Sequence, residues 1–211
     1  MDENKIRIRS EKELSIRKKE FLRICDILDK LNVNYFLQTG ILLGALRDNS
    51  LIKWDWDIEI SVFGEEFINV IDEVAKELSK NDFIINNINK KKNDSKIDFV
   101  GKLDESVTGY TIFSWYYSKI RKVYWRREYS VPEKYFNKLS KINFMGREFN
   151  CPNNPKDYLA FAYGDWRTPI RTSVKNVYNT SHFKNKKIFT ILETIKILKR
   201  IIHKIKVGIR L

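Results

Sequence analysis

The stretch from Trp54 to Ile60, WDWDIEI, alternates acidic and large apolar side chains, and it restricts the possible folds more than any other feature. In a β-strand successive side chains point to opposite faces, so Asp55, Asp57 and Glu59 would share one face. Carboxylates two positions apart lie about 6.6 Å apart and repel by about 2.5 kcal/mol at an effective dielectric constant of roughly 20. An acidic strand face open to water is one interpretation. A divalent cation site is the other, because Mg²⁺ takes oxygen ligands from one or two carboxylates and from substrate phosphates.

The composition favours a folded protein with oxygen rather than nitrogen ligands for any metal. The chain has 211 residues, of which 43% are hydrophobic and 13% aromatic, enough for one domain with a substantial core. Only two histidines, His182 and His203, are present, so a histidine-rich zinc site is not expected. Cys25 and Cys151 lack C-x-x-C spacing and no signal-peptide pattern is visible, so we expect reduced thiols and a cytoplasmic protein.

The chain is strongly basic, with 40 Lys and Arg against 27 Asp and Glu and a formal net charge of +13. Such an excess favours polyanionic partners: nucleic acid, phosphorylated small molecules or an anionic membrane surface. A composition rich in Lys, Asn and Ile is equally typical of an AT-rich genome. The charge alone therefore does not choose a partner.

Hydrophobic periodicity predicts an α+β order of elements. Ser10 and Glu13 form a capping box at the start of a helix over 10–31, and Asn154 with Pro155 is typical of the start of a helix that ends at Gly164. Further predicted helices cover 40–47, 64–80 and 186–206, and predicted strands cover 33–38, 54–62, 83–88, 96–103, 109–117 and 121–131, with a hairpin over 142–149. No apolar run is long enough to span a bilayer.

A glycine-containing turn precedes the predicted acidic strand. Gly40 would lie at a helix start, where backbone N–H groups and the helix dipole favour a phosphate and glycine lets it approach. Phosphates bound there would lie beside the carboxylates that hold a bridging metal. This order of elements indicates phosphoryl or nucleotidyl transfer.

Three ordered motifs carry a more specific signal: G-x-L-L-G-x-x-R at 40–47, I-x-W-D-x-D-I-E-I at 52–60, and Tyr158-Leu159 followed by Y-G-D-W at 163–166 and Pro169. Over residues 34–170 the chain thereby resembles the LicD family of phosphotransferases, with which fukutin and fukutin-related protein share a similar catalytic domain. It departs from the family pattern at Gln38 and Glu59, where Asp is common, at Trp56, where an acid is frequent, and at Lys53, where Pro is frequent.

The resemblance implies a nucleotidyltransferase-like fold, with a mixed β-sheet flanked by helices, and a CDP-linked donor such as CDP-choline or a CDP-alditol. Family members transfer the phospho group of the donor to a glycan hydroxyl and release CMP. At the matching positions, Asp57 and Glu59 correspond to the acid pair that holds Mg²⁺ or Mn²⁺. Asp55 corresponds to a neighbouring acid that orients ligands or substrate.

Other residues are candidates for the same site. Asp98 is predicted to supply a third carboxylate, as a metal ligand or general base, unless it is an ordinary acid on an exposed strand face. Arg47 suits the donor diphosphate, and Thr39 and Gly40 can offer a hydroxyl and an N–H to the same phosphates. The remaining substrate-binding candidates are Gly44, for which close helix packing is the alternative, and Asp165 and Arg167, which adjoin a predicted helix stop.

Aromatic side chains gather in the predicted strands over 109–131. Trp115, Tyr116, Tyr117, Tyr124 and Trp125 can form a cage for a choline group, because quaternary ammonium ions bind over aromatic faces. Alternating aromatic residues in strands are also typical of a core. Both interpretations are open at this stage.

The chain is expected to divide into a catalytic domain over 1–180 and a basic amphipathic segment over 181–211. In that segment Ile and Leu lie on one helical face and Lys and Arg on the other, which is typical of an anchor on anionic lipid through 186–211. Docking on the domain or on a second subunit explains the pattern equally well. An anchor would place the protein at the inner face of the membrane.

Three functions compete. The leading hypothesis is a metal-dependent transfer of a phosphocholine-type or phospho-alditol-type group from a CDP-linked donor to a cell-surface glycan or its lipid-linked precursor, as in capsule, lipopolysaccharide or teichoic acid synthesis. The alternative is nucleotidyl transfer of NMP to a small molecule or protein, with release of pyrophosphate. A non-catalytic nucleic-acid-binding module is the third, but no nucleic-acid motif supports it and no nucleic acid partner is expected.

Overall fold

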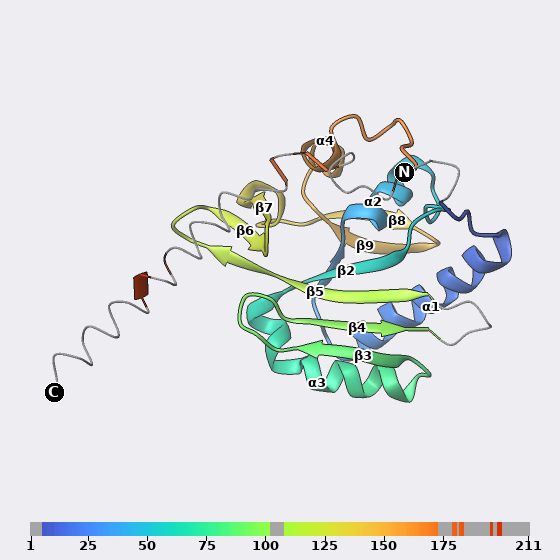
Figure 1. Ribbon diagram of the computed structural model, residues 1–211, viewed down its shortest axis with the longest axis horizontal. Helices are drawn as coiled ribbons and strands as arrows, with labels where there is room; N and C mark the ends of the chain where they lie inside the picture. The colour runs from blue at the N-terminus through green and yellow to red at the C-terminus, as the bar shows by residue number, and fades with distance from the viewer. Residues whose placement is uncertain are drawn as a thin grey trace.

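A mixed β-sheet forms the centre of the molecule (Figure 1). The computed structural model describes residues 6–101, 108–172, 179–180, 182–183, 195 and 198–199. The sheet has the order β1-β2-β5-β4-β3, and β6 and β7 extend it from the end of β5. β2 and β5 are parallel, and the other neighbouring strands are antiparallel. The predicted α+β class with a mixed sheet flanked by helices is confirmed.

The strands and helices are short and well delimited. The strands of the main sheet are β1 (Tyr35–Leu37), β2 (Asp57–Phe63), β3 (Ile84–Asn89), β4 (Lys96–Val100), β5 (Gly109–Ser118), β6 (Val123–Arg126) and β7 (Tyr129–Pro132), and β8 (Ser140–Phe144) and β9 (Arg147–Cys151) form a separate hairpin. The helices are α1 (Glu11–Lys30), α2 (Thr39–Arg47), α3 (Gly64–Lys80), α4 (Pro155–Tyr163) and the 3₁₀ turn η2 (Glu133–Tyr135).

Two apolar clusters cover the two faces of the sheet. α1 and α3 pack together on one face, against β-strand side chains such as Ile58, Ile60 and Ile112. α2 and α4 pack together on the other side, at the top of Figure 1, where Leu42 and Leu159 meet aromatic residues of β5 and η2. Each Å² of apolar surface buried in these clusters stabilises the fold by roughly 25 cal/mol, and this burial is the main driving force for the arrangement.

Most of the predicted helices are found in the structure, and the residues at their ends show why they start and stop there. α1 begins at the predicted capping box, in which Ser10 Oγ accepts from the Glu13 N–H and Glu13 accepts from the Ser10 N–H. α4 begins at Pro155 as predicted, but Asn154 makes no side-chain cap and has a left-handed φ of 48°. The positive φ of Gly164, 70°, ends that helix.

Two strand predictions are wrong in part. The acidic strand begins at Asp57 rather than at 54, because residues 53–56 form a turn and loop. The predicted strand over 121–131 is two strands, β6 and β7, separated by a tight turn in which Arg127 has a φ of 50°. The predicted hairpin over 142–149 is confirmed by the pairing of β8 with β9. The predicted strands over 83–88 and 96–103 are found as the antiparallel neighbours β3 and β4.

The proposed basic helix over 186–206, and most of the segment over 181–211, lie outside the described residues. Within the part of the chain that is described, no helix combines the length and the apolar character needed to cross a membrane.

Candidate active site

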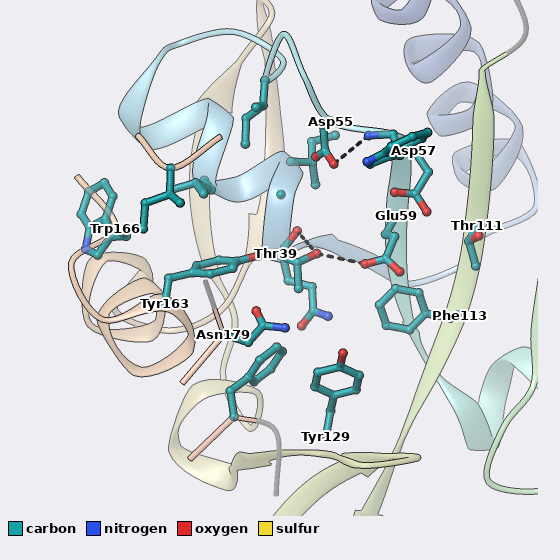
Figure 2. A pocket seen from close by; sticks show the side chains of 18 of the residues that line it. Thr39, Asp55, Asp57, Glu59, Thr111, Phe113, Tyr129, Tyr163, Trp166 and Asn179 are labelled. Atoms are coloured by element: carbon teal, nitrogen blue, oxygen red, sulfur yellow. Dashed lines mark hydrogen bonds between the residues drawn. The ribbon is translucent and has the colours of Figure 1, made fainter. Parts of the chain in front are cut away.

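A cavity of about 720 Å³ lies on the face of the sheet opposite α1 and α3. Its walls come from β2, β5, α2, the β6–β7 turn and residues that follow α4. Figure 2 shows Asp55, Asp57 and Glu59 along one wall, with Tyr129, Tyr163 and Asn179 on the other side of the cavity.

β2 positions the acid pair. Ile58 and Ile60 are buried in the core with α1 and α3, so the alternating residues Asp57 and Glu59 point to the opposite face and line the cavity. The predicted separation of acidic and apolar faces is therefore confirmed for residues 57–60. It is wrong for Trp56, which is 68% exposed at the cavity rather than packed with the isoleucines.

Asp55 precedes the strand and is held by the loop. Its Oδ1 accepts a hydrogen bond of 3.0 Å from the Trp56 N–H, drawn as a dashed line in Figure 2. A Cβ atom at residue 40 would lie 2.4 Å from Asp55 Oδ2. Gly40 therefore makes room for the Asp55 carboxylate, whereas the sequence predicts a phosphate beside this glycine.

The electrostatic environment of Asp55 favours a cation nearby. Burial and, after it, the neighbouring Asp57 carboxylate together raise the pKa of Asp55 to about 6, and Arg17 opposes this rise. Arg17, on α1, is itself buried, and its Nη1 donates a 3.0 Å hydrogen bond to the backbone oxygen of Asp55. A carboxylate whose ionisation is disfavoured by burial and by a second acid is stabilised by a divalent ion bound nearby.

Thr39 connects α2 to the acid pair. Its hydroxyl lies 3.4 Å from Glu59 Oε2 and 2.8 Å from the backbone oxygen of Gln38 (Figure 2). Thr39 has a φ of 51°, an unfavourable conformation for a β-branched residue. Such strain persists where the surrounding structure enforces it, commonly at functional sites.

Asp98 lies in the cavity wall but away from the acid pair. Thr111 of β5 is paired with Glu59 on one side and with Asp98 on the other, so two strand spacings of about 4.8 Å separate the two acids. Lys96 and Asn87 donate to Asp98 Oδ2 and Thr111 donates to Oδ1. The structure thus does not place Asp98 with Asp57 and Glu59 in one ligand set, contrary to the prediction of a third metal ligand.

The predicted arginine of α2 is already engaged. Arg47 lines the cavity, but its Nε and Nη2 donate to the two oxygens of Asp48, each at 2.8 Å, and its guanidinium lies over Trp54. Gly44 does not line the cavity. A Cβ there would lie 2.4 Å from the backbone oxygen of Ser50, so close packing is the role that the structure gives this glycine.

Of the two candidates after α4, only Asp165 lines the cavity. The Thr168 hydroxyl donates to Asp165 Oδ2 at 2.7 Å, and this bond lowers the pKa of the carboxyl. Arg167 is absent from the cavity wall, and its guanidinium lies 4.6 Å over the ring of Trp166.

Several residues that line the cavity were not among the predicted site residues. Gln38 and Arg126 line it, and so do aromatic side chains that come from four separate segments: Phe113, Tyr129, Tyr163 and Phe183. Of the aromatic cluster that the sequence offered as a choline cage, Trp115 and Tyr116 are buried, and only Trp115 adjoins the cavity. Their packing agrees with the core interpretation.

Comparison with known proteins assigns the family. The LicD family, described as the LicD/FKTN/FKRP nucleotidyltransferase domain, matches residues 32–154, more than half of the chain. The chain belongs to the LicD family. The matched region contains α2, the acid pair on β2 and the β6–β7 turn, whereas α1 precedes it. Membership of the LicD family is consistent with a transferase.

Curated relatives extend the comparison. Ribitol 5-phosphate transferase FKRP from Homo sapiens is 24% identical over 161 residues, which cover 67% of this LicD chain and 30% of that protein. The Mus musculus protein of the same name is 23% identical with the same coverage. The chain thus spans about 30% of the length of the curated relatives it matches.

Solved structures of ANT(2'')-Ia also match. The solution structure of this antibiotic-resistance factor is 14% identical, with a TM-score of 0.47, and the match covers 93% of this chain and 96% of that one. A crystal structure of ANT(2'')-Ia with adenylyl-2''-tobramycin is 14% identical, with a TM-score of 0.42, and the match covers 68% and 76% of the two chains.

The acid pair fits the divalent cation that the LicD resemblance implies. Mg²⁺ is commonly held by one or two carboxylates, with substrate phosphates and water completing its shell, and Asp57 and Glu59 line one wall of a cavity large enough for such a ligand. Across the described ranges, no three His, Cys, Asp or Glu side chains gather closely enough to hold a metal on their own. The fit is therefore to a cation that protein and substrate share.

Proposed function

We propose that this LicD protein is a metal-dependent phosphotransferase that moves a phosphocholine-type or phospho-alditol-type group from a CDP-linked donor to a hydroxyl of a cell-surface glycan or its lipid-linked precursor. The observation that carries the proposal is the pair Asp57 and Glu59, which lines a cavity of about 720 Å³ within the matched family region. A cavity of this size accommodates a nucleotide-linked donor.

The reaction exchanges one ester for another. The acceptor hydroxyl oxygen forms a bond to the phosphorus that carries the choline or alditol, and the bond from that phosphorus to the bridging oxygen of the diphosphate breaks. CMP leaves with the bridging oxygen and the hydroxyl proton is released. The acceptor gains the phospho-substituent, so atoms and charge balance.

Different residues of the cavity would bind the metal, position the acids and stack against the donor. Asp57 and Glu59 would hold Mg²⁺ or Mn²⁺, which when bound neutralises charge on the phosphate oxygens. Thr39 and Arg17 keep Glu59 and the Asp55 loop in place through the contacts described above. The aromatic side chains of Tyr129 and Tyr163 border the cavity opposite the acids and offer surfaces against which a base or sugar can stack.

Product analysis tests the proposal. Purified protein is incubated with Mg²⁺, a glycan acceptor and each of CDP-choline, CDP-ribitol and CDP-glycerol, and the released nucleotide is identified by chromatography. We expect CMP from at least one donor, and none from the Asp57→Asn variant. Release of pyrophosphate from CTP in its place would identify the chain as a nucleotidyltransferase, and no product from any donor would contradict the proposal.

A further inference from the structure

Arg126 is a largely buried cation in the cavity wall. Arg126 is 8% exposed and lies at the end of β6, where it lines the same cavity as the acid pair. Its guanidinium carbon is 3.8 Å from the centroid of the Phe113 ring. The charge therefore sits on an aromatic surface with little access to bulk water, where an unpaired charge is costly.

The described residues supply no hydrogen-bond partner for the Nε atom of Arg126. Arg126 Nε is buried without an acceptor, and no described carboxylate lies within ion-pair distance of the guanidinium. Burial lowers the pKa of Arg126, while the negative charge of Glu59 raises it. The negative charge of Glu59 thus acts on the guanidinium of Arg126.

A second orphaned donor borders the same cavity. Gln38 is fully buried, its Oε1 accepts a 2.9 Å hydrogen bond from the Tyr158 hydroxyl, and its Nε2 has no partner. Burial raises the pKa of Tyr158, and the negative charge of Glu59 adds to that rise. Gln38 adjoins Thr39, whose hydroxyl lies 3.4 Å from Glu59 Oε2, and Gln38, Glu59 and Arg126 line the same cavity. Gln38 and Arg126 both present N–H groups that the described protein leaves unsatisfied.

The neighbouring arginines differ. Arg127 donates to both oxygens of Asp94, and Arg47 donates to both oxygens of Asp48. Each already has a carboxylate partner. Among the three arginines that line the cavity, Arg126 is the one for which the described residues provide no anion.

We propose that Arg126, with the amide of Gln38, binds a phosphate group of the ligand, and so forms the anion subsite that faces the metal-binding acids. The assignment rests on the proposed function and refines it, since it moves the diphosphate contact from Arg47 to Arg126. A diphosphate held between a cation at Glu59 and the Arg126 guanidinium would be contacted from both sides, and guanidinium groups bind phosphate through charge-assisted hydrogen bonds.

Binding of three probes tests the subsite by calorimetry in the presence of Mg²⁺: CDP, inorganic pyrophosphate and cytidine. We expect Arg126→Met to weaken binding of CDP and pyrophosphate by about 10- to 100-fold and to leave cytidine binding within about twofold. Arg126→Lys, which keeps the charge, should retain part of the affinity. The thermal midpoint of the Met variant should change little, because methionine keeps an apolar contact with Phe113 and removes a buried N–H donor that lacks a partner.

Arg147→Met is the matched control. Arg147 also lies over a phenylalanine, 5.4 Å from the Phe149 centroid, but pairs with Asp26 and does not line the cavity. Its replacement should leave all three affinities unchanged. Loss of CDP and cytidine binding in equal measure in Arg126→Met, or unchanged CDP binding, would overturn the assignment, and so would a wild-type protein that binds neither CDP nor pyrophosphate.

The test separates this inference from the proposed function. Arg126-dependent binding of pyrophosphate without release of CMP from any CDP-linked donor would support the subsite and contradict the transfer reaction. Release of CMP that is insensitive to Arg126→Met would do the reverse.

Discussion

Gly40 and Asp55 occupy neighbouring space: a Cβ atom at residue 40 would lie 2.4 Å from Asp55 Oδ2. The contact joins the start of α2 to the loop before β2, two segments that the family motif places 15 positions apart. This contact is a sufficient reason for a glycine at residue 40, because any larger residue would collide with the Asp55 carboxylate.

Gly40→Ala should displace the Asp55 carboxylate and lower the transfer rate by roughly 10-fold or more, since small shifts of positioning groups cost that much. The fold should tolerate the change, because the contacted atom is the end of a side chain and alanine favours a helix by about 1 kcal/mol over glycine. CMP release and the thermal midpoint are the measurements.

Gly44→Ala provides the contrast on the same helix. Its Cβ would meet the backbone oxygen of Ser50 at 2.4 Å, which cannot move without shifting the chain. We expect a lower thermal midpoint for this variant. If Gly40→Ala lost stability and Gly44→Ala did not, the roles assigned to the two glycines would be reversed.

Asp57→Asn and Glu59→Gln should each reduce Mg²⁺-dependent transfer by at least about 100-fold, because each removes an anionic ligand for the cation. Asp98→Asn should cost much less, since Lys96, Asn87 and Thr111 already engage that carboxylate. Initial rates at saturating donor compare the three. Equal losses in all three variants would return Asp98 to the metal site.

The titration of Asp55 should be visible as a pH dependence of stability in the metal-free protein. Its pKa is about 6 in the folded chain against an ordinary value of 3.8, so the folded state binds more protons between these pH values. The free energy of unfolding therefore falls as the pH rises from about 4 to 6, by up to about 3 kcal/mol for this group.

Denaturant unfolding in EDTA at pH 5 and pH 7.5 measures that dependence. Asp55→Asn carries no charge at either pH, so the loss of stability between the two should be smaller in the variant than in the wild type. An identical pH dependence in both proteins would show that burial and the Asp57 carboxylate do not raise the pKa of Asp55.

The two thiols should report global unfolding. Cys25 and Cys151 are free and buried, and burial raises their pKa values to about 12 and about 11. Few thiolates exist at neutral pH, and the reagent cannot reach them. A disulfide reagent such as Ellman's should react slowly with the native protein. It should react rapidly with both thiols once guanidinium chloride has unfolded the chain. Rapid reaction of either thiol in the native state would contradict the described packing.

Local patterns predicted the elements that carry their own signals. The capping box at Ser10, the proline at the start of α4 and the alternation over Asp57–Ile60 each act within a few residues, and each is found in the structure. The position of Trp56 was not predictable in this way. The alternating pattern continues through it, but the loop that ends at β2 turns its side chain towards solvent.

The missing part of the site depends on long-range packing. Arg126 ends an ordinary aromatic strand, and no motif in the sequence marks it. Gln38 directly precedes the predicted residues Thr39 and Gly40, but its side chain was not predicted to contribute to the site. Their chemistry arises because β6, α2 and β2 border one cavity. The engagement of Arg47 by Asp48 is equally a matter of three-dimensional geometry, although the two residues are adjacent in the chain.

α1 ends before the region that defines the family begins, yet it inserts Arg17 beneath the Asp55 loop and accepts, through Glu20, a 2.7 Å hydrogen bond from Tyr110 of β5. A recombinant fragment trimmed to the shared region would remove a counter-charge from under the acids and uncover the apolar side of the sheet. The N-terminal helix is thus part of the smallest unit of this chain that can be expected to fold and work.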